Sequence, residues 1–392
     1  MTNPAEMFLN TEIQVNAYDL VVVELPLATP FNLPFGTIET RPSVWLQVSG
    51  EVDGVPGNGA AEGTSLPIQI PLYDDCSGNL EQNVSRVMGT LAGERLTLHE
   101  AGVIIADVAL NGTFATARMT AETALLDMAA RTKGTSVYEA ITGHQLDGPI
   151  AVPYGKSIAE NEYGKLVDAG VAAAERGAQR LKFKLSPGNH AAVTAGIREL
   201  QRHYPDASFM VDANGMFDPN NTRHLAMLAE VDALGLMMIE EPVSRAKEGT
   251  LRGLNAHRQL KRKMTFDTPV ALDDSITSRE SARVALEEGL GEIINLKPGR
   301  VGSFVECLQV ADMAKQTGNQ IMVGGMLEAT PGRTMTLTLA ALCLREGFTI
   351  PGDVSLPQER ITQDLLPATE QLRLDDNNNV IFHPGKGWGY KL

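Results

Sequence analysis

The chain has 392 residues and a formal net charge of −15, because 48 acidic residues outnumber 33 basic ones. Such an excess of negative charge disfavours nucleic acids and anionic membrane surfaces as partners. The hydrophobic content of 43% and the charged content of 21% are typical of a globular protein, and the length predicts at least two domains.

The beginning of the chain has no basic stretch followed by an apolar core, and no apolar run reaches the roughly 18 residues that a membrane helix needs. We therefore expect neither a secretory signal nor a membrane-spanning segment. The three cysteines, Cys76, Cys307 and Cys343, are odd in number and far apart. This pattern is typical of reduced thiols rather than of a disulfide framework, so we expect a cytoplasmic protein.

Residues 12–62 are rich in β-branched side chains with turn signals between them. The pair Asp53-Gly54 lies between two apolar runs and predicts a hairpin turn. Residues 80–91 and 117–133 follow with helical patterns, and the second places its apolar residues on one face. Residues 1–140 are therefore predicted to form an α+β domain.

From residue 151 onward, short apolar runs alternate with helical segments, as expected for strands that are buried on both faces of a parallel sheet. The runs are 151–152, 180–185, 208–211, 236–239, 269–272, 293–296, 320–323 and 348–350. Eight such units predict a closed (β/α) barrel over residues 141–350. An open doubly wound sheet is the alternative, but the glycine-rich dinucleotide turn after a first strand is missing. Residues 351–392 contain no barrel unit and are expected to return to the N-terminal domain.

Charged side chains recur at the C-terminal ends of five successive runs. They are Lys182, Lys184, Asp212, Glu240, Asp273 and Lys297, and the gaps from Lys184 onward are 28, 28, 33 and 24 residues. Because each gap is about one strand–helix unit, we expect these side chains to converge on the rim where barrel enzymes carry out their chemistry. A single carboxylate after a strand is more often a helix cap, and a Lys-x-Lys pair is more often a solvated edge. Their recurrence in consecutive units favours a functional site.

Three carboxylates that converge on one rim would repel one another unless a cation lies between them. Oxygen ligands with room left for water suit Mg²⁺. A lysine on either side of that ion supplies two potential proton-transfer groups. Nearby cations and partial desolvation lower an amine pKa toward the working pH, as a general base requires.

Around these residues the sequence resembles the enolase superfamily, in its muconate-lactonizing-enzyme subgroup. The matching segments are 181–184 (Leu-Lys-Phe-Lys), 211–215 (Val-Asp-Ala-Asn-Gly), 239–242 (Ile-Glu-Glu-Pro), 272–275 (Leu-Asp-Asp-Ser) and 295–300 (Asn-Leu-Lys-Pro-Gly-Arg). Segments 152–157, 324–328 and 348–353 are most similar to the o-succinylbenzoate synthase / N-succinylamino-acid racemase group. Dipeptide epimerases typically carry an Asp-x-Asp element where this chain has Gly-Gly-Met-Leu-Glu. The chain departs from the family pattern at Asp274 and in the basic residues 244–263.

The resemblance implies a (β/α)7β barrel whose α+β capping domain is completed by the C-terminal segment. It implies removal of a proton α to a carboxylate, through an enediolate, with Mg²⁺ as the cofactor and Mn²⁺ as a possible substitute. The implied metal ligands are Asp212, Glu240 and Asp273. Lys184 and Lys297 would act as acid and base, and Lys182 would favour the neutral form of Lys184 by like-charge repulsion.

By the same resemblance, the capping domain covers the barrel mouth and selects the substrate. The candidate lid segments are residues 29–36 and 62–67, and an apolar lid would exclude water from a charged intermediate. The alternative is that the lid phenylalanines belong to the core of the capping domain. The expected substrate-binding residues are Phe31, Phe35, Ser157, Asn214, Arg300, Gly325 and Met326. Arg300, one helical turn beyond Lys297, is also expected to adjust that lysine.

Two reactions fit these residues. As an o-succinylbenzoate synthase, a lyase of menaquinone biosynthesis, the protein would use Lys184 as the base and Lys297 to stabilise charge. As an N-succinylamino-acid racemase, an isomerase, it would use both lysines from opposite faces, and the two activities can coexist. Dipeptide epimerase and muconate cycloisomerase are further options in the superfamily.

Two alternatives lie outside the superfamily. A pyridoxal-phosphate enzyme has no use for three clustered carboxylates, and a non-catalytic binding protein has no use for two proton-transfer lysines. The expected partners are therefore a small carboxylate substrate and further copies of the chain in a homo-oligomer.

Overall fold

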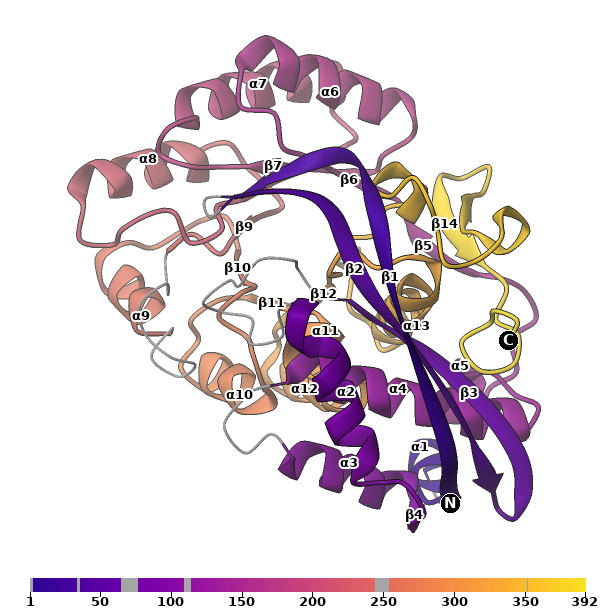
Figure 1. Ribbon diagram of the computed structural model, residues 1–392. Helices are drawn as coiled ribbons and strands as arrows, with labels where there is room; N and C mark the ends of the chain where they lie inside the picture. The colour runs from indigo at the N-terminus through magenta and orange to yellow at the C-terminus, as the bar shows by residue number, and fades with distance from the viewer. Residues whose placement is uncertain (1–2, 34–35, 65–76, 109–113, 244–253, 351) are drawn as a thin grey trace.

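The computed structural model describes residues 3–33, 36–64, 77–108, 114–243, 254–350 and 352–392, and Figure 1 shows their arrangement. The N-terminal unit holds an antiparallel sheet in the order β3-β2-β1-β4. Its strands are β1 (Glu12–Leu33), β2 (Gly36–Val52), β3 (Val55–Thr64) and β4 (Arg95–Thr97). The predicted hairpin turn is confirmed, because Asp53 (φ 49°) and Gly54 (φ 78°) adopt the left-handed conformation between β2 and β3.

The helices of this unit are α1 (Pro4–Leu9), α2 (Ser77–Gly89), α3 (Leu98–Asp107), α4 (Ala115–Thr132) and α5 (Val137–Thr142). The helices predicted at 80–91 and 117–133 correspond to α2 and α4. Strand β3 approaches α4 so closely that a Cβ on Gly59 would lie 2.5 Å from the carbonyl oxygen of Ala124. A glycine at this position therefore allows the sheet to pack directly on the helix.

The second unit contains a curled parallel sheet in the order β12-β11-β10-β9-β8-β7-β6. Its strands are β6 (Gly155–Ile158), β7 (Arg180–Lys184), β8 (Ser208–Asp212), β9 (Met238–Glu240), β10 (Val270–Leu272), β11 (Ile293–Leu296) and β12 (Gln320–Val323). Its helices are α6 (Tyr163–Glu175), α7 (His190–His203), α8 (Thr222–Asp232), α9 (Leu254–Lys263), α10 (Arg279–Glu287), α11 (Pro298–Val301), α12 (Phe304–Thr317) and α13 (Thr330–Arg345). Figure 1 shows helices around the outside of this sheet and a separate N-terminal unit, so the predicted fold class is confirmed.

Two of the eight predicted barrel strands are wrong. Residues 151–152 lie in β5 (Ile150–Pro153), which pairs with β14 (Asn379–Phe382) in a small antiparallel sheet that β13 (Arg373–Leu374) completes. The first barrel strand is β6 instead, whose Gly-Lys-Ser-Ile sequence has no apolar run because it faces a charged interior. Residues 348–350 form no strand.

The barrel closes through the residues that follow. The N–H of Asp353 donates to the carbonyl of Val323 at 2.7 Å, and the N–H of Gly155 donates to the carbonyl of Val354 at 2.9 Å. These bonds tie the chain after residue 351 to β12 on one side and to β6 on the other. The segment that contains Asp353 and Val354 thus occupies the place where an eighth strand was expected.

The C-terminal segment also contacts the N-terminal unit, after the short helices η1 (Pro357–Glu359) and η2 (Ala368–Glu370). The indole N–H of Trp388 donates to the carbonyl of Thr123 at 2.9 Å, and the hydroxyl of Tyr390 donates to the carbonyl of Ala60 at 2.6 Å. Both donors are buried. The C-terminal residues therefore pack into the N-terminal unit, whereas the domain boundaries at residues 140 and 350 stay predictions.

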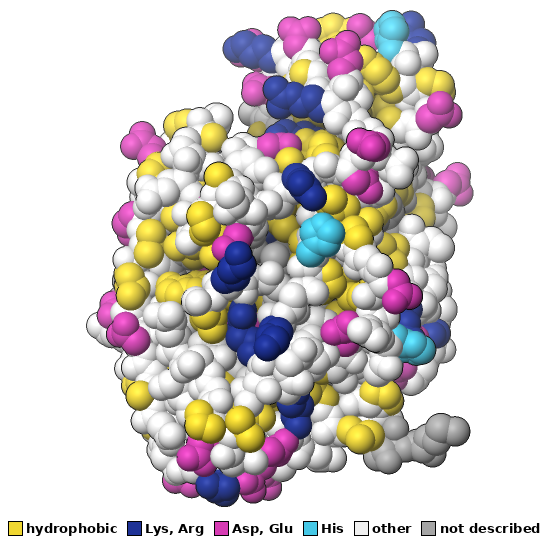
Figure 2. Space-filling model, turned by 90° about the vertical axis from the view of Figure 1, so that its right-hand side faces the viewer, with side chains coloured by type: hydrophobic (Ala, Val, Ile, Leu, Met, Phe, Trp, Pro, Cys, Tyr) yellow, Lys and Arg dark blue, Asp and Glu magenta, His cyan; other side chains and the backbone are white. Residues whose placement is uncertain are grey.

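Hairpin β1–β2 extends from the N-terminal sheet toward the barrel (Figure 1). Leu25 packs with Ala329 and Ile361 in a buried apolar cluster, which brings β1 to the start of α13. Figure 2 shows acidic and basic side chains interspersed with apolar ones on one face of the molecule. No helix in the described part of the chain is both long and apolar enough to cross a membrane.

Candidate active site

The charged residues predicted from the sequence come together at one end of the barrel sheet. Parallel pairing places Lys184 beside Asp212, and Asp212 beside Glu240. Asp273 and Lys297 directly follow the next two strands of the sheet, β10 and β11. The carboxylates are buried, with at most 2% of each residue exposed. Met210, Met238 and Ala271 lie two residues before the three carboxylates, and they form a buried apolar cluster with Ile293 and Met322.

Lys182 points to the same side of β7 as Lys184 but lies deeper. Its ammonium group forms ion pairs with Asp353, Glu240 (3.1 Å) and Asp212 (3.6 Å). Although burial alone would lower the pKa of Lys182, these carboxylates raise it above its ordinary value. Lys182 is therefore held as a cation that offsets buried negative charge. Its expected effect on Lys184 stays a prediction.

Lys184 is the most accessible of the site lysines, with a side chain 28% exposed against 4% for Lys182 and 12% for Lys297. It donates hydrogen bonds to Asp212 Oδ2 at 2.7 Å and to Asn214 Oδ1 at 2.8 Å. Asn214 has a left-handed backbone (φ 43°), and its N–H donates to Asp212 Oδ1 at 3.0 Å. Asn214 thus orients the amine and the first carboxylate together.

Glu240 lies between Lys182 and Asn295, whose side-chain amide donates to Glu240 Oε1 at 2.7 Å. Burial, and then the charge of Asp212, raise the pKa of Glu240 to about 7, although Lys182 opposes this effect. Burial next to other carboxylates thus disfavours the negative charge of Glu240. Another cation among the carboxylates would offset it.

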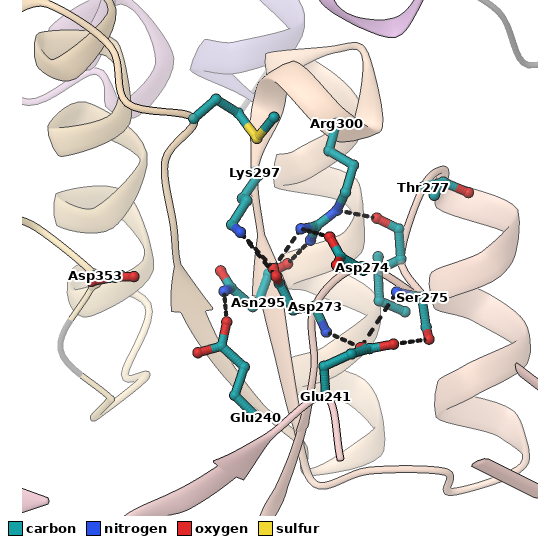
Figure 3. Close-up of polar contacts among 12 residues, drawn as sticks. Glu240, Glu241, Asp273, Asp274, Ser275, Thr277, Asn295, Lys297, Arg300 and Asp353 are labelled. Carbon is teal, nitrogen blue, oxygen red and sulfur yellow. Dashed lines mark hydrogen bonds and ion pairs between the residues drawn. The ribbon is translucent and has the colours of Figure 1, made fainter. Parts of the chain in front are cut away.

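Asp273 receives two cationic side chains from the segment that follows β11 (Figure 3). Lys297 lies 2.9 Å from the carboxylate, and the Arg300 guanidinium also forms an ion pair with it. Burial would raise the pKa of Asp273, but Arg300 and Lys297 hold it well below its usual range.

Arg300 also acts on Lys297. Burial would lower the pKa of Lys297, Asp273 raises it above the ordinary value, and Arg300 opposes that increase. Arg300 is fixed in place because Nε donates to the carbonyl of Ile276 at 2.7 Å and Nη2 donates to the carbonyl of Asn295 at 2.6 Å. The predicted influence of Arg300 on Lys297 therefore has an electrostatic basis.

The donor set fits a hard divalent cation. In the conformations of the described residues, no three His, Cys, Asp or Glu side chains form a ready-made metal-binding group. The candidate ligands Asp212, Glu240 and Asp273 each face a lysine instead. Buried carboxylates on adjacent strand ends, one with a raised pKa, are nevertheless the chemistry that Mg²⁺ or Mn²⁺ requires. A bound cation would replace these ion pairs.

The segment after β12 borders the site. A Cβ on Gly324 would lie 2.8 Å from Lys297 Cε, so a glycine leaves room for that lysine. Gly325 comes next, and the Met326 side chain touches α11, where a Cβ on Gly299 would lie 3.4 Å from Met326 Cγ. Met326 thus lies beside the lysine-bearing segment, whereas a Cβ on Gly325 would meet Glu328 and Arg333; the substrate-binding roles of both residues stay predictions. Two further candidates have side chains outside the described part of the chain: Phe31 and Phe35.

Sequence reasoning missed Asp353 and Asn295. Asp353 forms ion pairs with Lys182 and with Arg180 (2.6 Å), and Ser157 Oγ lies 3.5 Å from its carboxylate. This contact places the predicted Ser157 inside the barrel. Asp353 closely follows the eighth apolar run, so the pattern that found the other carboxylates also points to it. Asn295 lies within an apolar run, where the sequence carries no comparable signal.

Glu62 belongs to one predicted lid segment, but its buried side chain connects the N-terminal unit to the barrel. It is buried and pairs with Arg41 at 2.9 Å. It also accepts hydrogen bonds from the N–H groups of Ala329 and Gly332, both at 3.0 Å, at the N-terminus of α13. The end of β3 is therefore fixed to the barrel segment that follows β12. The other residues of this lid segment that lie beyond Thr64 are outside the described residues.

Comparison with known proteins agrees with this geometry. Residues 165–392 match the family described as "Enolase C-terminal domain-like", and residues 17–142 match "Mandelate racemase / muconate lactonizing enzyme, N-terminal domain". An N-succinylamino acid racemase from Thermus thermophilus is 31% identical over 92% of this chain and 92% of its own. An o-succinylbenzoate synthase from Geobacillus kaustophilus is 29% identical over 94% of this chain and 91% of its own.

Solved structures share the fold. A protein from Enterococcus faecalis described as an unknown member of the enolase superfamily has a TM-score of 0.81 at 26% identity, over 96% of this chain and 95% of its own. Muconate lactonizing enzyme from Pseudomonas putida has a TM-score of 0.80 at 20% identity, over 97% of both chains. Because both family domains match and the curated relatives align over nearly the full length, this chain belongs to the enolase superfamily of enzymes.

Proposed function

We propose that this protein is a Mg²⁺-dependent enzyme that removes a proton α to a carboxylate, and that it acts as an o-succinylbenzoate synthase. One observation carries the proposal: the order of charged side chains around adjacent strand ends. That order is Lys184, Asp212, Glu240, Asp273 and Lys297 on β7 to β11. Amines thus flank a row of buried carboxylates on both sides, which suits proton transfer next to a bound cation.

Lys184 is the base in this proposal. It is the most accessible site lysine, and Asp212 and Asn214 fix its amine by hydrogen bonds. When bound by the carboxylates, a divalent cation would offset the second negative charge that develops on the substrate carboxylate as its α-proton leaves. Lys182 remains cationic below this layer and adds fixed positive charge.

In the synthase reaction, Lys184 would take the α-proton of a cyclohexadiene carboxylate and the ring hydroxyl would leave as hydroxide, which completes an aromatic ring. Lys297 would contribute positive charge without transferring a proton. In the second candidate function, N-succinylamino-acid racemase, Lys297 would deliver a proton to the face opposite Lys184. The second function is supported by the pKa-lowering effect of Arg300 on Lys297 and by the Thermus relative.

Other superfamily reactions have less support. A relative named L-Ala-D/L-Glu epimerase is 26% identical, below the synthase and racemase relatives quoted above. The muconate lactonizing enzymes are similar in fold at about 20% identity. Neither comparison favours dipeptide epimerase or muconate cycloisomerase over the two proposed activities.

The test is an assay of the purified protein with the cyclohexadiene synthase substrate and with a panel of N-succinyl amino acids, each with Mg²⁺ and with EDTA. The proposal expects o-succinylbenzoate with Mg²⁺ and none with EDTA. Lys184→Ala should abolish turnover, whereas Lys315→Ala, at a lysine that is 52% exposed, should not. Racemisation without synthesis would replace the first function by the second. The absence of both reactions would contradict the proposal. Light scattering tests the expected homo-oligomer.

A further inference from the structure

A buried polar cluster lies behind the strand ends that carry Glu240 and Asp273. Its members are Glu241, Ser275 and His257, which are 1%, 0% and 2% exposed. Figure 3 shows the Glu241 side chain directed toward Ser275 and the backbone of Asp273. Because these side chains are sealed from solvent, the cluster cannot contact a substrate and can act only through its neighbours.

The cluster holds the backbone of a candidate metal ligand. Glu241 Oε2 accepts a hydrogen bond from the N–H of Asp273 at 2.8 Å, and Glu241 Oε1 accepts one from the hydroxyl of Ser275. Nε2 of His257 lies 3.2 Å from Glu241 Oε1 and 3.0 Å from Ser275 Oγ. An ionised Glu241 would only accept hydrogen bonds, so this contact suits the tautomer of His257 that carries its proton on Nε2.

The backbone of Glu241 is itself constrained. Its φ of 39° lies in the left-handed region, which a residue with a side chain adopts only when its surroundings enforce it. The N–H of Glu241 donates to the carbonyl of Ala271 on β10, and its carbonyl accepts the N–H of Gly215 beyond β8, both at 2.8 Å. Glu241 therefore links the ends of β8, β9 and β10, the strands that end in the three carboxylates.

His257 connects this link to α9, the basic helix whose role the sequence did not explain. The helix is fixed at its other residues, since Arg258 donates to Glu288 at 2.7 Å and Lys263 donates to the carbonyl of Pro219 at 3.0 Å. The basic side chains thus attach α9 to neighbouring barrel loops. His257 lies on the buried face of this helix with Leu254 and Leu260, and its ring contacts Glu241.

We propose that His257 is a positioning residue of the metal site: by holding Glu241 and Ser275 in place, it fixes the Asp273 strand end and so sets the affinity for a divalent cation. This inference rests on the proposed Mg²⁺-dependent function. Residues that orient metal ligands typically change metal affinity by about 10- to 100-fold when they are replaced. We expect a loss of that size when the imidazole is removed.

The test measures binding of Mg²⁺ alone to the full chain by isothermal titration calorimetry, without substrate. His257→Leu should weaken binding by about 10- to 100-fold. His257→Gln keeps a donor near the position of Nε2 and should bind within about threefold of the parent protein. The matched control is His190→Leu, because His190 is also buried (6% exposed) but contacts the carbonyl of Met227 and the carboxylate of Glu230 on α8, away from the candidate metal ligands.

The outcomes are distinct. Unchanged Mg²⁺ affinity in His257→Leu, an equal loss in His257→Gln, or an equal loss in His190→Leu would overturn the positioning role. If His257→Leu does not give a folded circular dichroism spectrum, Ser275→Ala replaces it with the same expected loss of affinity, and unchanged binding there overturns the inference. A parent protein that does not bind Mg²⁺ would instead overturn the proposed function on which the inference rests.

Discussion

Replacing Asp353 with Asn would remove the negative charge that two buried cations share where the barrel closes. Lys182 and Arg180 have side chains only 4% and 1% exposed, and both form ion pairs with this carboxylate. Asn has nearly the same shape as Asp, but Arg180 and Lys182 donate to different oxygens of Asp353, and Asn offers only one oxygen as an acceptor. The substitution therefore removes the charge together with one of the two hydrogen bonds.

The expected loss follows from the surroundings. Removing one partner of a buried ion pair costs about 3–5 kcal/mol of folding free energy. Lys182 keeps its ion pairs with Glu240 and Asp212, so the loss should lie near the lower limit, about 3 kcal/mol. The pKa of Asp353 is held well below its usual range, since burial opposes but Lys182 and Arg180 favour the charged form.

Urea unfolding of the parent protein and of Asp353→Asn measures this loss. A group with a depressed pKa stabilises the fold above its unfolded-state pKa of about 3.9, and that stabilisation disappears as the pH falls. The difference between the two proteins should therefore be constant from about pH 8 to about pH 5. The control is Glu346→Gln, in an exposed pair with Lys315, with an expected loss of at most about 1 kcal/mol. Equal effects of the two substitutions would refute the argument.

Three other predictions concern single residues. Arg300→Gln should lower racemisation about 10-fold more than dehydration, because the pKa of Lys297 would rise further, and equal losses in both assays would contradict this. Gly324→Ala should lower both kcat and the melting temperature, because its Cβ would lie 2.5 Å from Oδ1 of buried Asn295 and 2.8 Å from Lys297 Cε; an unaltered kcat would contradict it. Burial raises the pKa of Glu122 from 4.5 to about 7, so the carboxyl binds its proton more tightly in the folded protein than in the unfolded chain. The free energy of unfolding therefore falls as the pH rises between these values. Urea unfolding at about pH 5 and about pH 8 should show a loss of about 3 kcal/mol that Glu122→Gln lacks, and parallel pH profiles would contradict it.

The strand-end carboxylates could be predicted because each follows a buried apolar run. In a parallel barrel, the residue just after such a run lies at the C-terminal end of its strand, on the rim of the barrel. Asp212, Glu240 and Asp273 satisfy this rule, and the structure places them on adjacent strands. Asp353 satisfies it only loosely, because the run before it forms no strand.

Other parts of the site depend on contacts that a local pattern does not contain. Asn295 lies inside β11 and faces the interior, where an apolar-run rule takes a polar residue as an interruption. The first barrel strand was misassigned for the same reason, since Ser157 on β6 faces Asp353 instead of an apolar core. Glu62 was expected in a lid, but its hydrogen bonds to α13 join segments about 270 residues apart, which no spacing rule predicts.

The central claim is that Lys184 removes the α-proton with the help of a divalent cation. Exchange of the α-proton of N-succinyl amino acids for deuterium in D₂O, followed by proton NMR, tests it most directly. The account predicts exchange of at least one antipode with Mg²⁺, loss of that exchange in EDTA, and a decrease of about 10²-fold or more in Lys184→Ala. Exchange that persists in EDTA, or that Lys184→Ala leaves intact, would contradict it.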